Sequence, residues 1–119
     1  MRVLILGGDG MLGHQLFRYF RERHDVRVTL RLDRETYAAH GLFEKGTAFY
    51  GIDVRQTDPL LQVFAEFHPE AVVNAVGIVK QRSDAKEVIP SLEINSLLPN
   101  RLALVCRTVG ARLVHLSTD

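Results

Sequence analysis

Three glycines near the start of the chain are spaced so that they could bind a phosphate group. Gly7, Gly10 and Gly13 follow four consecutive apolar residues, and a helical pattern begins at Met11. In a turn from a strand into a helix, glycines allow a tight turn, close approach of the backbone to a ligand, and close packing of the helix on the strand. Unpaired N–H groups and the positive end of the dipole would hold an anion at the helix start. The stretch therefore predicts a binding site for a dinucleotide pyrophosphate, with Met11 and Leu12 in contact with the cofactor.

The glycine spacing has two interpretations. It is G-x-x-G-x-x-G rather than the commoner dinucleotide fingerprint G-x-G-x-x-G, and glycines alone are a weak signal. A turn between a strand and a helix could need glycine only for its shape. The strand before and the helix after supply the context that binding requires, so we favour binding. A nucleoside-triphosphate loop is excluded because no Gly-Lys-Ser or Gly-Lys-Thr follows the turn.

The end of the second expected strand bears on the choice of dinucleotide. NAD-binding proteins usually place an acidic residue there to bind the ribose 2′-hydroxyl, whereas this strand ends in Thr29-Leu30-Arg31. Arg31 and Arg34 could bind a 2′-phosphate, so we expect NADP(H) rather than NAD(H). Asp33 is better placed as a helix cap. The alternative, two solvated surface arginines, stays open.

Two further strand ends carry candidate binding residues. Asp53-Val54 follows the third expected strand, where the carboxylate could bind adenine and the valine could pack on its ring. The alternative is an aspartate that serves a turn. Ala75-Val76-Gly77 ends the fourth strand, and such small residues would let the cofactor lie across the strand end. Asn74 before them needs hydrogen-bond partners if it is buried.

Three other features allow weaker inferences. Lys80-Gln81-Arg82 could meet substrate phosphates or form a solvated loop, and Ser117-Thr118-Asp119 could point a hydroxyl into a cleft or cap a helix. The histidines, at positions 14, 24, 40, 68 and 115, have no metal-ligand spacing, and we expect His14 to be exposed. Cys106, the single cysteine, excludes an internal disulfide and is expected in the core.

Strand and helix patterns alternate along the chain, which predicts an α/β fold with a doubly wound parallel sheet. Right-handed crossovers give five strands in the order 3-2-1-4-5, with ligands at their carboxyl ends. The expected strands lie at 3–6, 26–30, 48–50, 71–75 and 112–116, and the expected helices at 11–23, 33–40, from 59 onward, and 91–109. We expect Leu12, Leu16, Tyr19 and Phe20 to form the apolar stripe of the first helix. In the third helix, with Asp58 as N-cap, that stripe is Leu60, Val63, Phe64 and Phe67.

Length and composition predict one soluble domain. The 119 residues are 46% hydrophobic and 24% charged, as in ordinary globular proteins. Fifteen basic and fourteen acidic residues give a net charge of +1, which offers no argument for binding nucleic acid or an anionic membrane. No apolar run has the length of a membrane span or of a signal peptide core. With a single cysteine, the simplest expectation is a reducing, cytoplasmic location.

Together these residues resemble the extended short-chain dehydrogenase/reductase superfamily. Within it they are most similar to the dTDP-4-dehydrorhamnose reductase group, sugar-nucleotide reductases of polysaccharide biosynthesis. The matching segments are 4–13, 73–81, 94–99 and 110–119. The resemblance implies that residues 1–119 form an NAD(P)-binding Rossmann domain whose full-length protein acts on a nucleotide-sugar. It also implies that Thr118 hydrogen-bonds the reacting oxygen of the substrate and that Asn95 helps order an active-site water.

One departure from the family pattern limits the expected activity. The family's catalytic Tyr-x-x-x-Lys pair and its sugar-binding region have no counterpart here, because none of the tyrosines at 19, 37 and 50 has a lysine four residues on. We therefore expect the N-terminal part of a reductase, truncated after the fifth strand and inactive alone. An epimerase or dehydratase of the same superfamily, or a non-catalytic dinucleotide sensor, are the alternatives. The exposed edge of the fifth strand predicts a homo-oligomer.

Overall fold

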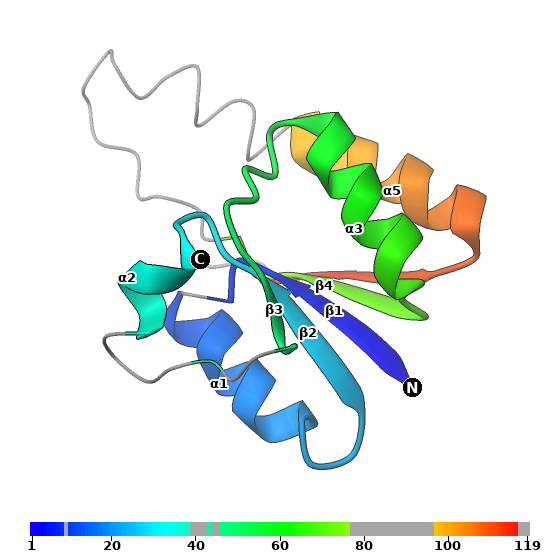
Figure 1. Ribbon diagram of the computed structural model, residues 1–119. Helices are drawn as coiled ribbons and strands as arrows, with labels where there is room; N and C mark the ends of the chain where they lie inside the picture. The colour runs from blue at the N-terminus through cyan, green and yellow to red at the C-terminus, as the bar shows by residue number, and fades with distance from the viewer. Residues whose placement is uncertain (9, 39–42, 44–45, 77–96, 117–119) are drawn as a thin grey trace, which may run out of the picture.

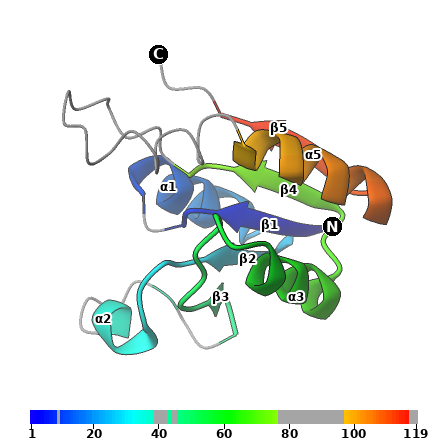
Figure 2. The ribbon, with the colours of Figure 1, turned by 90° about the horizontal axis from the view of Figure 1, so that it is seen from above.

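The computed structural model describes residues 1–8, 10–38, 43, 46–76 and 97–116. The strands and helices alternate along the chain, as the sequence predicts (Figure 1). In chain order they are β1 (Arg2–Leu6), α1 (Met11–Phe20), β2 (Asp25–Thr29), α2 (Arg34–Ala38), β3 (Ala48–Phe49), α3 (Thr57–Phe67), β4 (Ala71–Asn74), α5 (Leu98–Val109) and β5 (Arg112–His115). The five strands are all parallel and lie in the order β3-β2-β1-β4-β5, which confirms the predicted topology (Figure 2).

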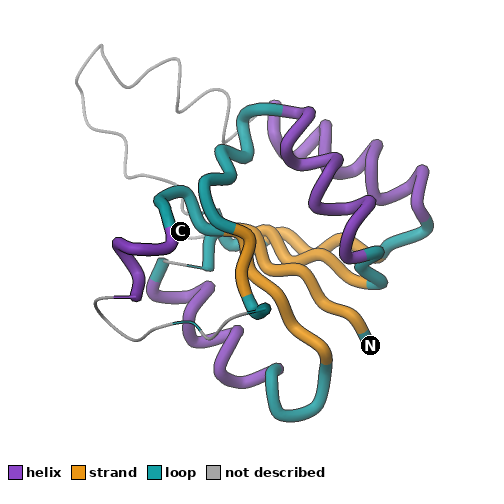
Figure 3. The backbone as a smooth tube through the Cα atoms, in the orientation of Figure 1, coloured by secondary structure: helices purple, strands orange, loops and turns teal. Residues whose placement is uncertain are grey.

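The sheet separates two hydrophobic cores. Helices α1 and α2 lie on one face, and α3 and α5 lie on the other (Figure 3). Because successive strand residues point to opposite faces, Val3 and Ile5 join the core under α1, and Leu4 and Leu6 join the core under α3 and α5. This is why the apolar run of β1 is uninterrupted, since a strand covered on both sides has no face for polar residues.

Helix α1 packs through a different face from the one we expected. Gly13 and Phe17 are its buried residues, whereas Leu12 is 39% exposed and Tyr19 is 67% exposed. The predicted stripe was therefore wrong at these two positions. The reason is Gly13, whose missing side chain lets the helix sit directly on the glycine turn and brings Phe17, one turn further on, into the core. The helix also ends at Phe20, three residues earlier than predicted.

Helix α3 confirms its predicted stripe and corrects its predicted start. Leu60, Val63, Phe64 and Phe67 are all buried. The helix begins at Thr57 with Gln56 as N-cap, so Asp58 is not the cap and Pro59 is the third helical residue. Proline fits there because the first N–H groups of a helix have no intrahelical partner in any case.

The carboxyl-terminal part of the described chain forms α5 and β5. Helix α5 ends at Val109, as predicted, and the next residue, Gly110, caps it with a φ of +76°. Cys106 is 2% exposed and lies in the core, as expected, and this burial raises the pKa of its thiol to about 11. Val114 of β5 is 48% exposed. Within the described part of the chain, no helix has both the length and the apolar character needed to cross a lipid bilayer.

Candidate functional site

The glycine turn packs against the carboxyl end of β4. Gly7 has a φ of +81°, in the left-handed region that favours glycine. A Cβ on this residue would lie 2.9 Å from the Cα of Val76 and 3.1 Å from the carbonyl oxygen of Ala75. Conformation and space therefore both require glycine at position 7, where the turn packs directly against Ala75 and Val76.

Two other glycines let α1 and β2 approach the turn. A Cβ on Gly13 would overlap the carbonyl oxygen of Gly7, so the helix can pack this closely only with glycine at position 13, as the sequence predicts. A Cβ on Gly8 would lie 2.5 Å from the Cβ of Val28. Sequence reasoning assigned no role to Gly8. The pair Gly7-Gly8 could have indicated this role, because the turn needs only one of the two glycines and the other then needs a separate reason.

Gly10 differs from these glycines because nothing in the described chain requires it. Its φ of −75° suits any residue, and an added Cβ would have, among the described atoms, only the carbonyl oxygen of Gly7 within 4 Å, at 3.6 Å. The residue is exposed, and the described part of the chain leaves the space in front of its backbone open. A ligand that approaches the backbone here would explain the glycine.

The start of α1 supplies hydrogen-bond donors beside this open space. The first intrahelical bond runs from the N–H of His14 to the carbonyl of Gly10, at 2.9 Å, so the N–H groups of Met11, Leu12 and Gly13 have no intrahelical acceptor. Among the described residues, no side chain caps this end and the first turn carries no acid. The helix dipole and these donors, which have no acceptor among the residues that the structure describes, thus favour an anion at this position.

Asp53 lies at the same edge of the sheet, and an arginine holds its carboxylate. The backbone N–H and the Nε of Arg55 each donate to Oδ1 at 3.0 Å, and Nη2 donates to Oδ2 at 2.7 Å. These hydrogen bonds, with a smaller contribution from the charge of Arg31, lower the pKa of Asp53. The guanidinium of Arg101 donates to the carbonyl of Arg55 at 2.8 Å and ties α5 to this loop. Asp53 therefore serves the turn that we considered as an alternative. The Nε of Arg55 also lies 3.2 Å from Oδ2, so Arg55 makes four hydrogen bonds to this carboxylate.

The neighbouring candidates differ in exposure. Val54 is 9% exposed and packs in the core under α3 and α5, which leaves little surface for an adenine ring. Arg31 and Arg34 are exposed at the carboxyl end of β2 and the start of α2. The loop between them is held by buried Tyr37, whose hydroxyl accepts the N–H of Leu32 at 3.3 Å.

Asn74 confirms the prediction that a buried amide must have partners. It is 8% exposed, its Oδ1 accepts the N–H of Val76 at 3.2 Å, and its Nδ2 lies 3.2 Å from Nδ1 of His115. His14 corrects an expectation, because it is half-buried and its ring packs edge-on against Phe43. Several other predicted site residues lie outside the described residues. They are Gly77, Lys80, Gln81, Arg82, Asn95, Ser117, Thr118 and Asp119.

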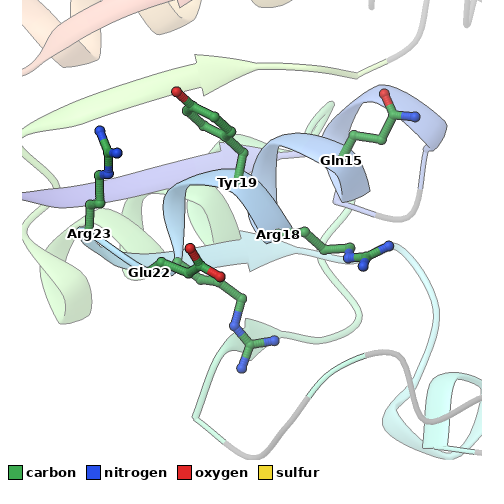
Figure 4. A pocket seen from close by; sticks show the side chains of 6 residues that line it. Gln15, Arg18, Tyr19, Glu22 and Arg23 are labelled. Atoms are coloured by element: carbon green, nitrogen blue, oxygen red, sulfur yellow. The ribbon is translucent and has the colours of Figure 1, made fainter.

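A shallow hollow elsewhere does not have the character of a binding site. It lies along the outer side of α1 and the turn that follows (Figure 4). Its lining residues are Gln15, Arg18, Tyr19, Arg21, Glu22 and Arg23. The labelled side chains point in different directions, whereas binding sites bring polar groups together. Among the described residues, no three His, Cys, Asp or Glu side chains gather in a way that could hold a metal ion.

Comparison with known proteins defines the class to which this fold and site belong. Residues 3–119 match the model of the NAD dependent epimerase/dehydratase family, and the chain belongs to that family. This confirms the resemblance inferred from the four sequence segments. A dTDP-4-dehydrorhamnose reductase of Streptomyces griseus is 31% identical over 118 residues, which are 99% of this chain and 33% of that protein.

Two solved structures show the same architecture at 25% identity or more. The UDP-glucose 4-epimerase of Thermus thermophilus, in complex with NAD, has a TM-score of 0.78 and 27% identity over 95% of this chain and 36% of that chain. The dTDP-4-dehydrorhamnose reductase of Bacillus anthracis, in complex with NADP, has a TM-score of 0.72 and 26% identity over 99% of this chain and 36% of that chain. The chain thus spans about a third of the length of the relatives it matches.

Proposed function

We propose that this chain binds a nicotinamide dinucleotide across the carboxyl edge of its sheet, as the cofactor-binding part of a sugar-nucleotide reductase. The observation that carries the proposal is the open space at Gly10, which the described chain leaves unfilled, at the end of α1 whose first N–H groups have no acceptor among the described residues. The pyrophosphate would lie there, on the N–H groups of Met11, Leu12 and Gly13. The relatives solved with NAD and with NADP support this assignment.

The rest of the cofactor would extend to both sides of the turn. Asp53 would bind the adenine through the part of its carboxylate that is exposed, since 29% of its side chain is accessible, with Val54 contributing the small part of its surface that is exposed. Residues 75–77 would support the cofactor where it crosses the end of β4. When bound, the dinucleotide supplies a hydride donor or acceptor. The chain's own residues bind it and orient it.

The substrate of the full-length protein would be a nucleotide-sugar, as the names of the relatives suggest. On the family resemblance, Thr118 would hydrogen-bond the reacting oxygen and Asn95 would help order a water. Residues 1–119 contain no Tyr-x-x-x-Lys pair. General acid catalysis of the kind such a tyrosine provides contributes roughly a hundredfold to ten-thousandfold, so we expect this chain to bind cofactor without reducing a sugar nucleotide.

The arginines after β2 support NADP(H) over NAD(H). Arg31 and Arg34 are exposed there, Arg31 lies close enough to Asp53 to lower its pKa, and no acid occupies the strand tip. Calorimetric titration with NADPH and with NADH tests the preference. We expect tighter binding of NADPH, and we expect Arg31→Gln to reduce that preference while Arg18→Gln, on the outer side of α1, leaves it unchanged. Equal or weaker affinity for NADPH in the parent protein contradicts the assignment.

A second candidate is an epimerase of the same family, which the similarity to the Thermus thermophilus UDP-glucose 4-epimerase favours. The two reactions differ in their use of cofactor, because a reductase consumes NAD(P)H and an epimerase regenerates it. Incubation of the full-length protein with a 4-keto nucleotide-sugar and NADPH, and separately with a 4-hydroxy nucleotide-sugar and NAD⁺, therefore separates them. Loss of NADPH in proportion to reduction of the 4-keto sugar supports a reductase, and inversion of the 4-hydroxyl group without net formation of NADH supports an epimerase.

We also propose self-association through β5. Its residues are mostly exposed, including Val114 of the face that continues the α1 core. Exposed strand edges and apolar patches recruit other chains. Light scattering at tens of micromolar is expected to show a dimer or larger species, and a monomer there contradicts the proposal. A reducing, cytoplasmic location also stays a proposal, based on the single cysteine.

A further inference from the structure

Two polar side chains are buried in the described part of the chain, and both lie beside the glycine turn. They are Thr29, which is 1% exposed, and Asn74, which is 8% exposed. Each is the last residue of its strand, and each pairs in register with Leu6, the residue before Gly7. Burying a polar side chain is unfavourable unless it makes hydrogen bonds, so their shared position calls for an explanation.

Thr29 holds the turn from the side of β2. Its Oγ1 accepts the N–H of Gly7 at 3.3 Å, and its backbone carbonyl accepts the N–H of Gly8 at 3.0 Å. Thr29 therefore accepts hydrogen bonds from the N–H groups of both Gly7 and Gly8. A valine at position 29 would have the same shape and would keep the backbone bonds of the strand, so the hydroxyl serves the turn rather than the sheet.

Asn74 supports the turn from the side of β4, but indirectly, because it binds Val76 rather than a residue of the turn. Its Oδ1 accepts the N–H of Val76, and the Cα of Val76 is only 2.9 Å from the position that a Cβ on Gly7 would take. Because Oδ1 is the acceptor, Nδ2 must be the donor to His115, whose Nδ1 is then unprotonated. The amide of Asn74 thus fixes the surface against which Gly7 packs.

We propose that Thr29 and Asn74 are positioning residues that hold Gly7 between β2 and β4 and so preset the turn for the dinucleotide. The proposal rests on the proposed function, since it assigns a purpose to the shape of that site. Neither side chain is required to touch the cofactor. Their effect is to keep the N–H groups at the start of α1 and the open space at Gly10 in place before binding, which reduces the ordering cost of binding.

Substitution of Thr29 tests the proposal with two readouts. Thr29→Val leaves the N–H of Gly7 without its side-chain acceptor. We expect the amide exchange of Gly7, measured by NMR without ligand, to accelerate about fivefold to a hundredfold, and the Kd for NADPH, measured by calorimetry, to rise by a similar factor. Thr29→Ser keeps the hydroxyl and should restore both values to within about twofold of the parent. Thr108→Val makes the same chemical change on α5 and should alter neither.

The outcomes separate this proposal from the proposed function. A parent protein that binds no NADPH or NADH overturns the proposed function and the binding part of this proposal, while Gly7 exchange still decides the contact with Thr29. Unchanged Gly7 exchange in Thr29→Val, or an unchanged Kd in a parent that binds, overturns the positioning role alone. If Thr29→Val does not fold, the Kd of the Thr29→Ser variant for NADPH decides. A Kd like that of the parent supports the positioning role of the hydroxyl, and a tenfold higher Kd overturns it.

Discussion

Alanine substitutions at Gly10 and Gly13 should separate the space needed for a ligand from the space needed for folding. At Gly13, an added Cβ would overlap the carbonyl oxygen of Gly7 and lie 3.2 Å from the Cα of Gly8. Backbone atoms cannot rotate away, so α1 must shift. Overpacking of this kind costs about 1–3 kcal/mol, and the better helix propensity of alanine offsets up to about 1 kcal/mol. We expect Gly13→Ala to lower the free energy of unfolding by roughly 1–2 kcal/mol and to weaken cofactor binding.

At Gly10 we expect the opposite, a small loss of folding stability and a large loss of cofactor affinity. The nearest described atom to an added Cβ is 3.6 Å away, which is an ordinary contact, and the φ of −75° suits alanine. Loss of glycine at the N-cap costs at most about 1 kcal/mol. The methyl group would, however, occupy the place of the pyrophosphate and disrupt hydrogen bonds to a charged group, each worth about 1.5–3 kcal/mol. We expect NADPH affinity to fall roughly tenfold to a hundredfold.

Thermal unfolding without ligand and calorimetric titration with NADPH measure the two effects separately. A loss of 1 kcal/mol lowers the Tm of a domain of this size by roughly 4 °C, so the Gly13→Ala change is measurable. The expected pattern is a large Tm loss for Gly13→Ala and a small one for Gly10→Ala, with binding impaired in both. If the Gly10→Ala protein binds NADPH as tightly as the parent, the space at Gly10 does not hold the pyrophosphate.

Three further predictions test other parts of the structure. Asp53→Asn should lower the free energy of unfolding near neutral pH. This difference from the parent should be present above pH 3.8 and disappear as the pH falls through the lowered pKa of Asp53. Urea unfolding at a series of pH values measures it, and a difference that does not change with pH contradicts the prediction. Cys106, with a thiol pKa raised to about 11 by burial, should react with a disulfide reagent at mildly alkaline pH only after unfolding, and rapid reaction of the native chain would show that the site is open. Phe17→Ala should lower the free energy of unfolding by about 3–5 kcal/mol, and Tyr19→Ala by less than about 0.5 kcal/mol, as measured by chemical denaturation. Similar losses in the two variants would mean that Tyr19 is buried, as the predicted apolar stripe had it.

The order of strands follows from local sequence patterns, and the same patterns predict where the candidate site lies. The alternation of apolar strands with helices, together with right-handed crossovers, is sufficient to give the sheet order. Gly7 and Gly13 could be assigned because a tight turn and a close helix contact are local requirements. The buried face of α1 could not be assigned in this way. Leu12 and Tyr19 fit a helical stripe, and only the contact at Gly13 turns them toward solvent.

The missed contacts join residues far apart in the chain. Asn74 meets His115 across 41 positions, and Gly7 meets Thr29 across 22. No periodicity in the sequence specifies such pairs, because they depend on the register of neighbouring strands. The hold of Arg55 on Asp53 is local, but an aspartate that serves a turn and one that binds a ligand have the same sequence signature.

Amide chemical shifts of the labelled chain during titration with NADPH show whether a nicotinamide dinucleotide binds at the glycine turn. We expect the largest shifts at residues 7–8 and 10–13 and at Ala75 and Val76, with little change at Gln15 and Tyr19 on the outer side of α1. Saturating NADPH that leaves the amides of residues 10–13 unmoved, or that shifts chiefly the outer side of α1, would contradict it.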